Sequence, residues 1–467
     1  MTKPIPGEGP DAAATEALRT SLRGPVITPD DQGYDAVRAV YNGMIDRRPA
    51  VVAQCVDAGD VIRALDWGRS SGLDIAVRGG GHSGPGSGVV DEGLVIDLSP
   101  IRWVRVDPEA RTADVGGGSQ LGDLDHAAHA FGLATPSGIA STTGVGGLTL
   151  GGGHGYLSRR YGLTIDNLLG VDIVLADGTF VSASETENDD LFWAVRGGGG
   201  NFGIVTSFTY RLHPVENVGV GITLWPIDEI PAVLRWYREF LPAAPEQLYG
   251  FFAVIEVPAG PPFPEEIHGQ KMAAVVWCYT GDLDRLEQAI APARDPARPA
   301  FDFSTPMPYP MLQTMFDGLL PAGLQWYWRG DFFDRISDDA IEIHLKYGST
   351  IPTMRSTMHL YPIDLAPQRV AKGETAWSYR DAVWSGIIAG IDPDPANRDV
   401  LREWSTEYWE ALHPHSMGGG YVNFMMDEGQ DRIRATYREN YDRLARVKAR
   451  YDRDNVFHVN QNVVPAI

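Results

Sequence analysis

The apolar positions between residues 50 and 83 follow a strand pattern, then a helix pattern, then a strand pattern again. Residues 51–56 and 75–77 are mainly apolar runs, typical of buried strands. The segment between them begins at Asp57, a residue suited to cap a helix, and carries apolar residues at helical spacing. The pattern therefore predicts a strand–helix–strand unit whose second strand leads into Arg78-Gly79-Gly80-Gly81-His82-Ser83.

The rest of the chain continues as a mixture of helices and strands. Further helices are predicted over residues 11–23, 34–45, 121–131 and 433–451, and further strands over residues 94–98, 103–106, 112–115, 204–210, 220–225, 250–257 and 272–279. From about residue 214 the strands are longer and richer in aromatic and β-branched residues, with amphipathic helices between them. This change indicates a second domain built on an antiparallel sheet, so the predicted fold class is α+β.

Glycine is concentrated in clusters. The chain has 53 glycines, and the densest clusters occupy residues 79–81, 144–155 and 197–203. A glycine-rich turn after a strand lets the backbone approach a ligand closely and direct N–H groups at phosphate oxygens. His82 is the nucleophilic side chain left at the first turn. The alternative for this segment is a flexible loop with an incidental histidine.

Gly198, Gly200 and Gly203 match the G-x-G-x-x-G spacing of dinucleotide-binding folds. That fingerprint has to follow a strand and open a helix. Here a helix-like segment precedes the glycines and a predicted strand follows them, so the context excludes a Rossmann site. No Walker A sequence occurs either.

The charge balance argues against a broad contact with a polyanion. The 39 Lys and Arg against 61 Asp and Glu give a formal net charge of -22, so we expect no nucleic-acid partner. No apolar run is long enough for a membrane span, and the first residues lack the apolar core of a signal peptide. Cys55 and Cys278 form no disulfide framework. We expect a cytoplasmic monomer or homodimer, with an uncommon export route as the alternative.

His126 and His129 share a predicted helix, but no third ligand is recognisable, so no metal site is expected.

Five motifs occur in an informative order and spacing. They are residues 78–83, 144–155 and 190–203, Tyr421-Val422-Asn423-Phe424, and Asn460-Gln461-Asn462. Together they resemble the berberine bridge enzyme-like FAD-linked oxidases of the vanillyl-alcohol oxidase/PCMH flavoprotein superfamily. The resemblance covers nearly the whole chain and is closest to bacterial members, which include nicotine oxidases, sugar oxidases and tailoring enzymes of secondary metabolism.

The resemblance implies a PCMH-type FAD-binding domain with two subdomains, and an inserted substrate domain with an antiparallel sheet and helices. The implied ranges are residues 1–212 for the FAD-binding domain, 213–419 for the substrate-binding domain, and 420–467 for a C-terminal segment that returns to the FAD domain.

The resemblance also implies that His82 is bonded to the 8α-methyl carbon of FAD. The other implied cofactor-binding residues are Arg78, Gly79, Gly80, Gly81, Ser83, Gly144, Gly146, Gly147, Gly151, Gly152, Gly153, His154, Gly203, Ile204, Val205, Tyr421, Asn423, Asn460 and Asn462. Among them the glycine amides would hold the pyrophosphate, Arg78 would neighbour that loop, and His154 is either near the flavin or a bystander. Many relatives add a second bond through a cysteine. Ala140 stands at that position, so we expect a monocovalent FAD.

Two residues are candidates for catalysis. Tyr421 would help to deprotonate the substrate, which requires a cation such as Arg329 or Lys346 to lower the pKa of the phenol; the alternative is a structural tyrosine. Thr143 aligns with the position that gates oxygen beside the flavin in this family. Its alternative is a threonine bonded to the backbone.

The function implied is an oxidase that takes a hydride from an alcohol, amine or phenolic or cyclic small molecule and reduces O2 to H2O2. The alternatives are a flavin dehydrogenase with another electron acceptor, an oxygenating tailoring enzyme, and a flavin-storage protein without turnover. A set of mainly aromatic residues would either line a substrate cleft or fill a sheet–helix core. The set comprises Trp326, Tyr327, Trp328, Arg329, His359, Tyr361, Tyr379 and Trp384.

Overall fold

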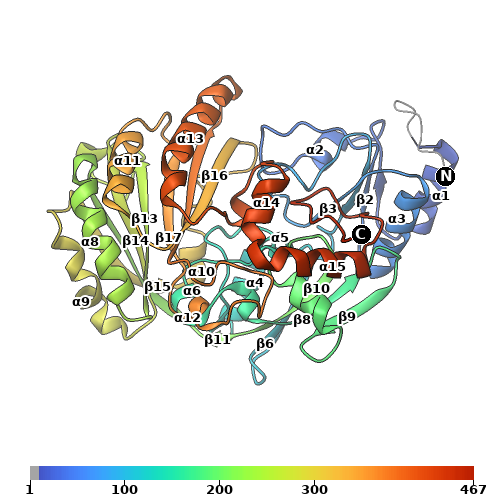
Figure 1. The fold of residues 1–467 in the computed structure, drawn as a ribbon, viewed down its shortest axis with the longest axis horizontal. Helices are drawn as coiled ribbons and strands as arrows, with labels where there is room; N and C mark the ends of the chain where they lie inside the picture. Colours follow the sequence, from blue (N-terminus) through green and yellow to red (C-terminus); the bar gives the residue numbers. More distant parts are fainter. Residues whose placement is uncertain (1–9) are drawn as a thin grey trace.

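The computed structural model describes residues 10–467 and has the expected α+β architecture (Figure 1). Its long axis runs from a large sheet at one end to two smaller sheets at the other. Among the described residues, no helix has both the length and the apolar character needed to cross a bilayer. The N-terminal residues on which the expected absence of a signal peptide rests lie outside the described range.

The first sheet confirms the predicted strand–helix–strand unit and adds a strand inside it. Its order is β1-β2-β4-β3, and β4 runs parallel to both β2 and β3. The strands are β1 (Val26–Ile27), β2 (Val51–Gln54), β3 (Ile75–Arg78) and β4 (Leu94–Asp97); α1 (Ala12–Ser21) and α3 (Ala58–Ser70) pack against them. Asp57 caps α3 by accepting a hydrogen bond from the amide of Asp60 at 3.0 Å.

The second sheet is antiparallel, in the order β5-β6-β10-β8-β9. Its strands are β5 (Val104–Asp107), β6 (Thr112–Gly116), β8 (Leu168–Val174), β9 (Phe180–Ser184) and β10 (Ile204–Arg211). The helices α4 (Leu121–His129), α5 (Val145–Leu150), α6 (Ser158–Tyr161) and α7 (Asp189–Val195) belong to the same half of the chain. β7 (Leu133–Ala134) pairs with β11 (His213–Pro214) next to this sheet. Because α7 precedes and β10 follows the third glycine cluster, the rejection of a Rossmann site is confirmed.

The third sheet has seven antiparallel strands in the order β15-β12-β14-β13-β17-β18-β16. They are β12 (Asn217–Pro226), β13 (Leu248–Glu256), β14 (Lys271–Tyr279), β15 (Phe301–Pro308), β16 (Gln325–Phe333), β17 (Thr357–Pro362) and β18 (Trp384–Asp392). One face is buried under α8 (Ile230–Ala243), α11 (Asp338–Gly348) and α13 (Arg398–Leu412) (Figure 1). The other face turns toward the first two sheets. The short helices α9 (Leu286–Ile290), α10 (Tyr309–Gln313) and α12 (Ala366–Arg369) lie in its connections.

Two predicted helices are wrong in extent. The helix expected over residues 34–45 ends early, as α2 (Tyr34–Arg38), because the next residues use their backbone groups elsewhere. The amide of Tyr41 donates to the carbonyl of Gly81 at 3.1 Å, and the carbonyl of Tyr41 accepts from Gly323 at 2.9 Å. These bonds tie the segment to the glycine turn and to the loop that leads into β16 of the third sheet.

The helix expected over residues 433–451 is divided into α14 (Gln430–Tyr437) and α15 (Tyr441–Tyr451). The break falls at Arg438, whose φ is 47°. Its guanidinium lies 3.5 Å from the centre of the Tyr379 ring and pairs with Asp381 at 2.9 Å. Contacts with a distant segment therefore decide a break that helical periodicity could not reveal.

Helix α15 of the C-terminal segment packs beside the second sheet (Figure 1), whereas Arg432 of α14 pairs with Asp331 of β16. Lys448 of α15 is 0% exposed and donates to the carbonyls of Asn201 at 2.8 Å and Phe457 at 2.7 Å. Its ammonium also pairs with Asp452 at 2.9 Å. We retain as a proposal the division into residues 1–212, 213–419 and 420–467, which this return of the chain supports.

Removing the Lys448 ammonium should destabilise the protein strongly, because it leaves a buried carboxylate and two carbonyls without their donor. We expect Lys448→Ala to lower the free energy of unfolding by about 3–5 kcal/mol. Lys372 pairs with Asp381 at 2.7 Å, but its side chain is 53% exposed, so Lys372→Ala should cost less than about 1 kcal/mol. Urea denaturation followed by circular dichroism measures both. Equal losses in the two variants would contradict the buried role of Lys448.

Candidate functional site

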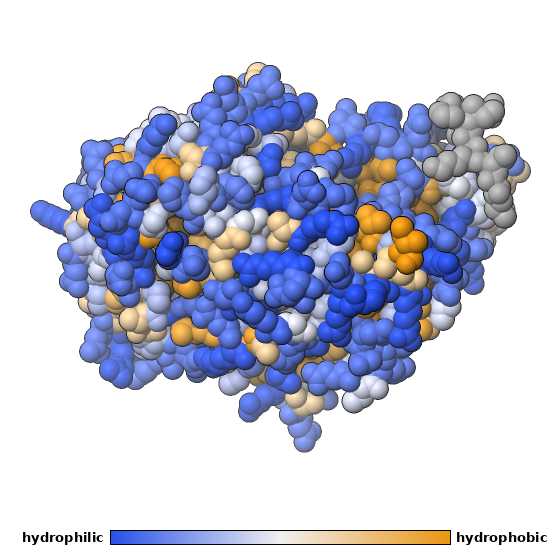
Figure 2. All heavy atoms as spheres, viewed as in Figure 1, coloured by the Kyte–Doolittle hydropathy of each residue, from blue (hydrophilic) through white to orange (hydrophobic). Residues whose placement is uncertain are grey.

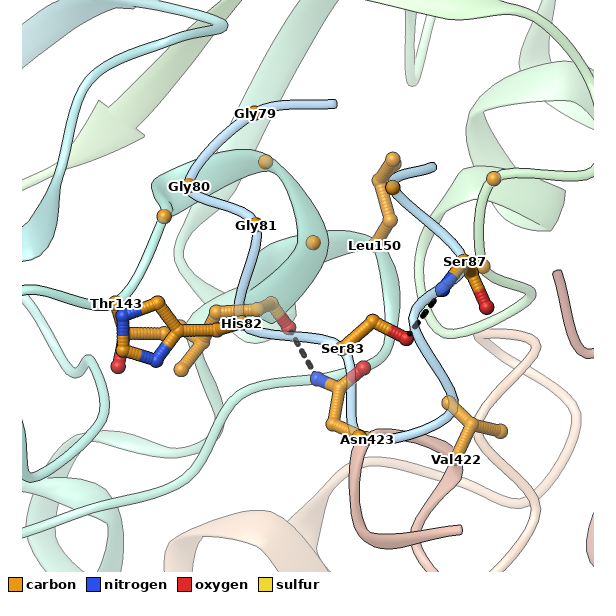
Figure 3. A pocket seen from close by; sticks show the side chains of 18 of the residues that line it. Gly79, Gly80, Gly81, His82, Ser83, Ser87, Thr143, Leu150, Val422 and Asn423 are labelled. Carbon is orange, nitrogen blue, oxygen red and sulfur yellow. Dashed lines mark hydrogen bonds between the residues drawn. The ribbon is translucent and has the colours of Figure 1, made fainter. Parts of the chain in front are cut away.

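A cavity of about 390 Å³ lies where the glycine clusters, the C-terminal segment and the third sheet meet (Figure 3). Its volume falls within the range of small-molecule sites. The residues around it come from β3 and its following turn, the start of α5, the third glycine cluster, residues 421–425 and the inner face of β16, β17 and β18. Segments far apart in sequence therefore enclose one site.

Two glycine turns touch through their backbones at this site. A Cβ added to Gly80 would lie 2.4 Å from the amide nitrogen of Gly144, and one added to Gly144 would lie 2.4 Å from that of Gly80. Any other residue at either position would force the turns apart. The amides of Gly79, Gly80 and Gly81 donate to no backbone carbonyl within residues 10–467. These N–H groups are therefore available to a ligand.

Gly147 and Gly200 border the cavity in a different way. A Cβ built on either would meet no atom within 4 Å, so their missing side chains leave open space. Open space at these glycines, with the free amides of Gly79 to Gly81 at the same cavity, suits a phosphate-bearing ligand, which binds through backbone N–H groups. Apolar residues around the same cavity, including Val77, Leu98 and Phe457, suit flat ring systems. The residues present thus fit FAD.

His82 ends the first glycine turn and projects beside Thr143 (Figure 3). Its ring stacks on Tyr41, with centroids 3.8 Å apart and planes at 17°. Burial lowers the pKa of His82 to about 4, although a hydrogen bond with the backbone of Thr142 opposes the shift. At neutral pH the imidazole is therefore uncharged and retains a nitrogen lone pair, which a nucleophile requires.

Tyr421 lies at the cavity with its hydroxyl fixed by two donors. The phenol oxygen accepts hydrogen bonds from the amide of Gly153 at 3.0 Å and from Nδ2 of Asn423 at 2.7 Å. Nδ2 of Asn423 also donates to the carbonyl of Leu148 at 3.2 Å, which fixes the amide. Burial raises the pKa of Tyr421 well above its usual value, and these two donors only partly oppose the shift.

The expectation of a cation beside Tyr421 is wrong. Neither proposed cation contacts it, since Arg329 pairs with Glu428 at 2.9 Å and Lys346 lies over the ring of Tyr347 at 4.8 Å. The residues that follow Tyr421 form a 3-10 turn, η8 (Val422–Phe424). The phenol is therefore neutral at ordinary pH, and the hydrogen-bonding capacity left to it is mainly its own O–H.

His154 occupies the centre of an aromatic cluster at the cavity. Its ring centroid is 4.7 Å from that of Tyr421 and 5.1 Å from that of Tyr361. Nε2 lies 3.2 Å from the hydroxyl of Ser385, and Nδ1 is buried without a partner among the described residues. Burial lowers the pKa of His154 to about 3, so this imidazole is also neutral.

Most residues expected at the site border the cavity. They are Arg78, Gly79, Gly80, Gly81, His82, Ser83, Thr143, Gly144, Gly146, Gly147, His154, Gly203, Ile204, Val205, Tyr421, Asn423 and Asn460. Arg78 pairs with the buried Asp97 at 2.8 Å, consistent with the expected role of a neighbour to the turn.

Four expected residues are not placed at the cavity wall: Gly151, Gly152, Gly153 and Asn462. The three glycines are required by packing, because an added Cβ would collide with the side chains of Asn423, Trp377 and Thr164 respectively. The carbonyl of Asn462 accepts a hydrogen bond from Gln430 at 3.1 Å. Gly153 acts on the site indirectly, through the hydroxyl of Tyr421.

Several lining residues were not identified from the sequence. They include Tyr41, Leu148, Gly199, Gly200, Asn201, Tyr437 and Gln461. Gly199, Gly200 and Asn201 lie in a glycine cluster that was recognised, so that signal was available. Tyr41 gave no signal, because it falls inside a segment predicted as a helix. Of the aromatic set, Trp326, Trp328, His359 and Tyr361 border the cavity, whereas Tyr379 and Trp384 are buried in cores.

Comparison with known proteins agrees with this architecture. Residues 49–184 match the family model described as an FAD binding domain, and residues 420–464 match the one described as berberine and berberine like. The chain is 31% identical to the (R)-6-hydroxynicotine oxidase of Paenarthrobacter nicotinovorans over 96% of its own length and 98% of that protein. It is 30% identical to an FAD-linked oxidoreductase of Bacillus subtilis (strain 168), over 96% of this chain and 98% of that one.

A solved structure gives the same result for the fold. The crystal structure of 6-hydroxy-D-nicotine oxidase from Arthrobacter nicotinovorans superposes with a TM-score of 0.84 and 28% identity, covering 96% of this chain and 99% of that one. Sequence and structure thus agree over nearly the whole length, including the FAD-binding domain. The protein is an FAD-linked oxidoreductase, and its chain belongs to the berberine bridge enzyme-like family of FAD-linked oxidases.

Proposed function

We propose that the protein is an oxidase that takes a hydride from an alcohol, amine or phenolic ring compound and reduces O2 to H2O2. The observation that carries the proposal is the convergence of the His82 turn and the hydroxyl of Tyr421 on one enclosed cavity. Bound FAD supplies a two-electron acceptor for the hydride and a donor to O2. Each turnover removes a hydride and a proton from the substrate, and these two electrons and two protons balance the conversion of O2 to H2O2.

His82 is the proposed attachment point of the flavin. Its neutral imidazole, held between Tyr41 and the backbone of Thr142, has the lone pair that bond formation needs. Ala140 also borders the cavity, and a methyl group cannot form the second bond that a cysteine would. Cys55 and Cys278 are buried free thiols outside the cavity wall. We therefore propose a single covalent bond between FAD and the protein, through His82.

Tyr421 is the proposed contact for the oxygen or nitrogen of the reacting group. Its O–H donates a hydrogen bond to that atom. When the phenol has lost its proton to solvent, the amides of Gly153 and Asn423 would stabilise the phenolate, which then takes the proton that the substrate loses as its hydride leaves. Thr143 is the proposed oxygen gate. It lies beside His82 at the cavity, and its side chain is small enough to leave room for O2.

We also propose a location, an oligomeric state and a range of partners for the enzyme. We propose a cytoplasmic monomer or homodimer without nucleic-acid partners. The two buried free cysteines and the acidic composition support this, as does the view in Figure 2, where hydrophilic residues cover most of the face. The alternative is a dehydrogenase that passes the electrons to another acceptor. The rate at which air reoxidises the reduced enzyme distinguishes it from an oxidase.

The two half-reactions test the proposed function. We expect a substrate among alcohols, amines and phenols to bleach the yellow holoenzyme without oxygen, and admitted air to restore the colour with one H2O2 for each substrate oxidised. Stopped-flow absorbance and a peroxide assay measure these steps. Bleaching followed by very slow recovery in air would identify a dehydrogenase instead. The absence of bleaching by any compound in a broad panel would contradict an oxidase of these substrates.

Variants of Tyr421 and Thr143 should affect opposite half-reactions. Tyr421→Phe should slow anaerobic reduction by about 10²-fold or more, since it removes the group that receives the substrate's proton. It should leave reoxidation nearly unchanged. Thr143→Leu should slow reoxidation and leave reduction much less affected, whereas Thr143→Val, which keeps the side-chain volume, should behave as the wild type does. Equal effects on both half-reactions in either residue's variants would argue against its assigned role.

Denaturation in acid tests the covalent bond. Flavin should remain on the wild-type polypeptide, and mass spectrometry of a digest should locate it on the peptide that contains His82. His82→Ala should still bind FAD through backbone amides but release it on denaturation. His154→Ala, across the cavity, should keep its flavin attached. Complete recovery of free FAD from the wild type, or a flavin on Cys55 or Cys278, would disprove the assignment.

A further inference from the structure

The third sheet contributes its own wall to the cavity. The lining residues from this sheet are Trp326, Trp328, Thr357, His359, Tyr361, Ile387, Ala389 and Ile391. In β17 the side chains alternate, so Met358 and Leu360 enter the helix-covered core while His359 and Tyr361 face the cavity side. The other side-chain hydrogen-bonding groups of this wall are less available to a ligand. The hydroxyl of Thr357 donates to the carbonyl of Val254 at 2.9 Å, and the indole N–H groups of Trp326 and Trp328 are buried.

His359 and Tyr361 form a hydrogen-bonded pair. Nδ1 of His359 lies 2.5 Å from the hydroxyl of Tyr361. Nε2 of His359 has no hydrogen-bond partner within residues 10–467. A phenol is a strong donor to an imidazole nitrogen, so the hydroxyl of Tyr361 donates to Nδ1. A neutral imidazole that accepts at Nδ1 carries its proton on Nε2, which leaves an N–H group without a partner.

His359 is one of the residues that line the cavity, so its unpartnered N–H is within reach of a ligand there. The side chain keeps accessible surface, yet burial lowers the pKa of His359 to about 3. The accessible surface and the lowered pKa are compatible, because the accessible part of the side chain faces an interior space rather than bulk solvent. Its ring packs against Phe251 at 5.0 Å, which limits its freedom to turn. The imidazole is thus a fixed, uncharged donor.

The cavity wall also lacks a free charge. Among the described residues that line it, Arg78 alone carries a permanent charge, and its guanidinium is neutralised by Asp97 at 2.8 Å. The imidazoles of His82, His154 and His359 are neutral, because burial lowers the pKa of each. Away from the glycine amides that suit a phosphate, a charged group of a substrate would lose its hydration without gaining an opposite charge, which is costly.

We propose that His359, oriented by Tyr361, is a specificity-determining residue that donates a hydrogen bond from Nε2 to an oxygen of a neutral ring compound. The proposal rests on the proposed oxidase function and narrows its substrates. The reacting group meets the hydroxyl of Tyr421, and a second oxygen, as carbonyl, ether or hydroxyl, meets His359. Carboxylates and permanently charged amines fit this cavity poorly.

A pair of ring compounds of nearly equal shape tests the hydrogen bond. Acetophenone has a carbonyl oxygen where α-methylstyrene has a methylene group, and their dissociation constants from the holoenzyme can be measured by calorimetry or by flavin absorbance. His359→Phe should shift the ratio of the two constants by about three- to tenfold toward α-methylstyrene, the size expected for one net hydrogen bond. His359→Gln keeps an N–H donor and should retain most of the wild-type preference.

Controls separate this proposal from general damage and from the proposed function. His126 is exposed on α4, so His126→Phe should leave the ratio unchanged. Tyr361→Phe removes the hydroxyl that fixes the tautomer of His359. This variant should therefore lose part of the preference for acetophenone over α-methylstyrene. An unchanged ratio in His359→Phe, or benzoate binding as tightly as acetophenone, would overturn the proposal. Because these probes report binding without turnover, a failed oxidase assay would overturn the proposed function and leave this result standing.

Discussion

The backbone contact between Gly80 and Gly144 is the constraint on which the site depends. It joins the turn after a parallel strand of the first sheet to the start of α5 beside the second sheet, at a distance that no Cβ permits. Because the two turns meet without side chains, free amides and an open groove remain for the cofactor. His82 and Thr143, each next to one of these glycine segments, are consequently neighbours at the cavity.

The third sheet completes the cavity through contacts that cross between the two halves of the molecule. Tyr41 joins the first glycine turn to residue 323 through its backbone and stacks on His82. Trp328 packs against Gly84, where an added Cβ would lie 2.5 Å from the indole. The sheet that supplies the apolar wall is therefore held directly against the loop that carries His82. The proposed sites of substrate recognition and of flavin attachment are therefore in direct contact.

Burial without charge gives the site its chemical character. The same desolvation that lowers the pKa of His82, His154 and His359 raises that of Tyr421. All four groups are uncharged near neutral pH, and they act as hydrogen-bonding groups or as a neutral nucleophile. The proposed hydride transfer would therefore take place among uncharged side chains.

The sequence by itself determined the α+β class, the strand before His82, and the glycine positions, because these follow from local periodicity and from the absence of Cβ atoms. It also carried the five spaced motifs that identify the family. The tertiary structure alone decided which glycines face the cavity, since Gly147 and Gly151 are alike in sequence but only Gly151 packs against Asn423. It also decided the break at Arg438 and the isolation of Tyr421 from cations, because these depend on residues far away along the chain.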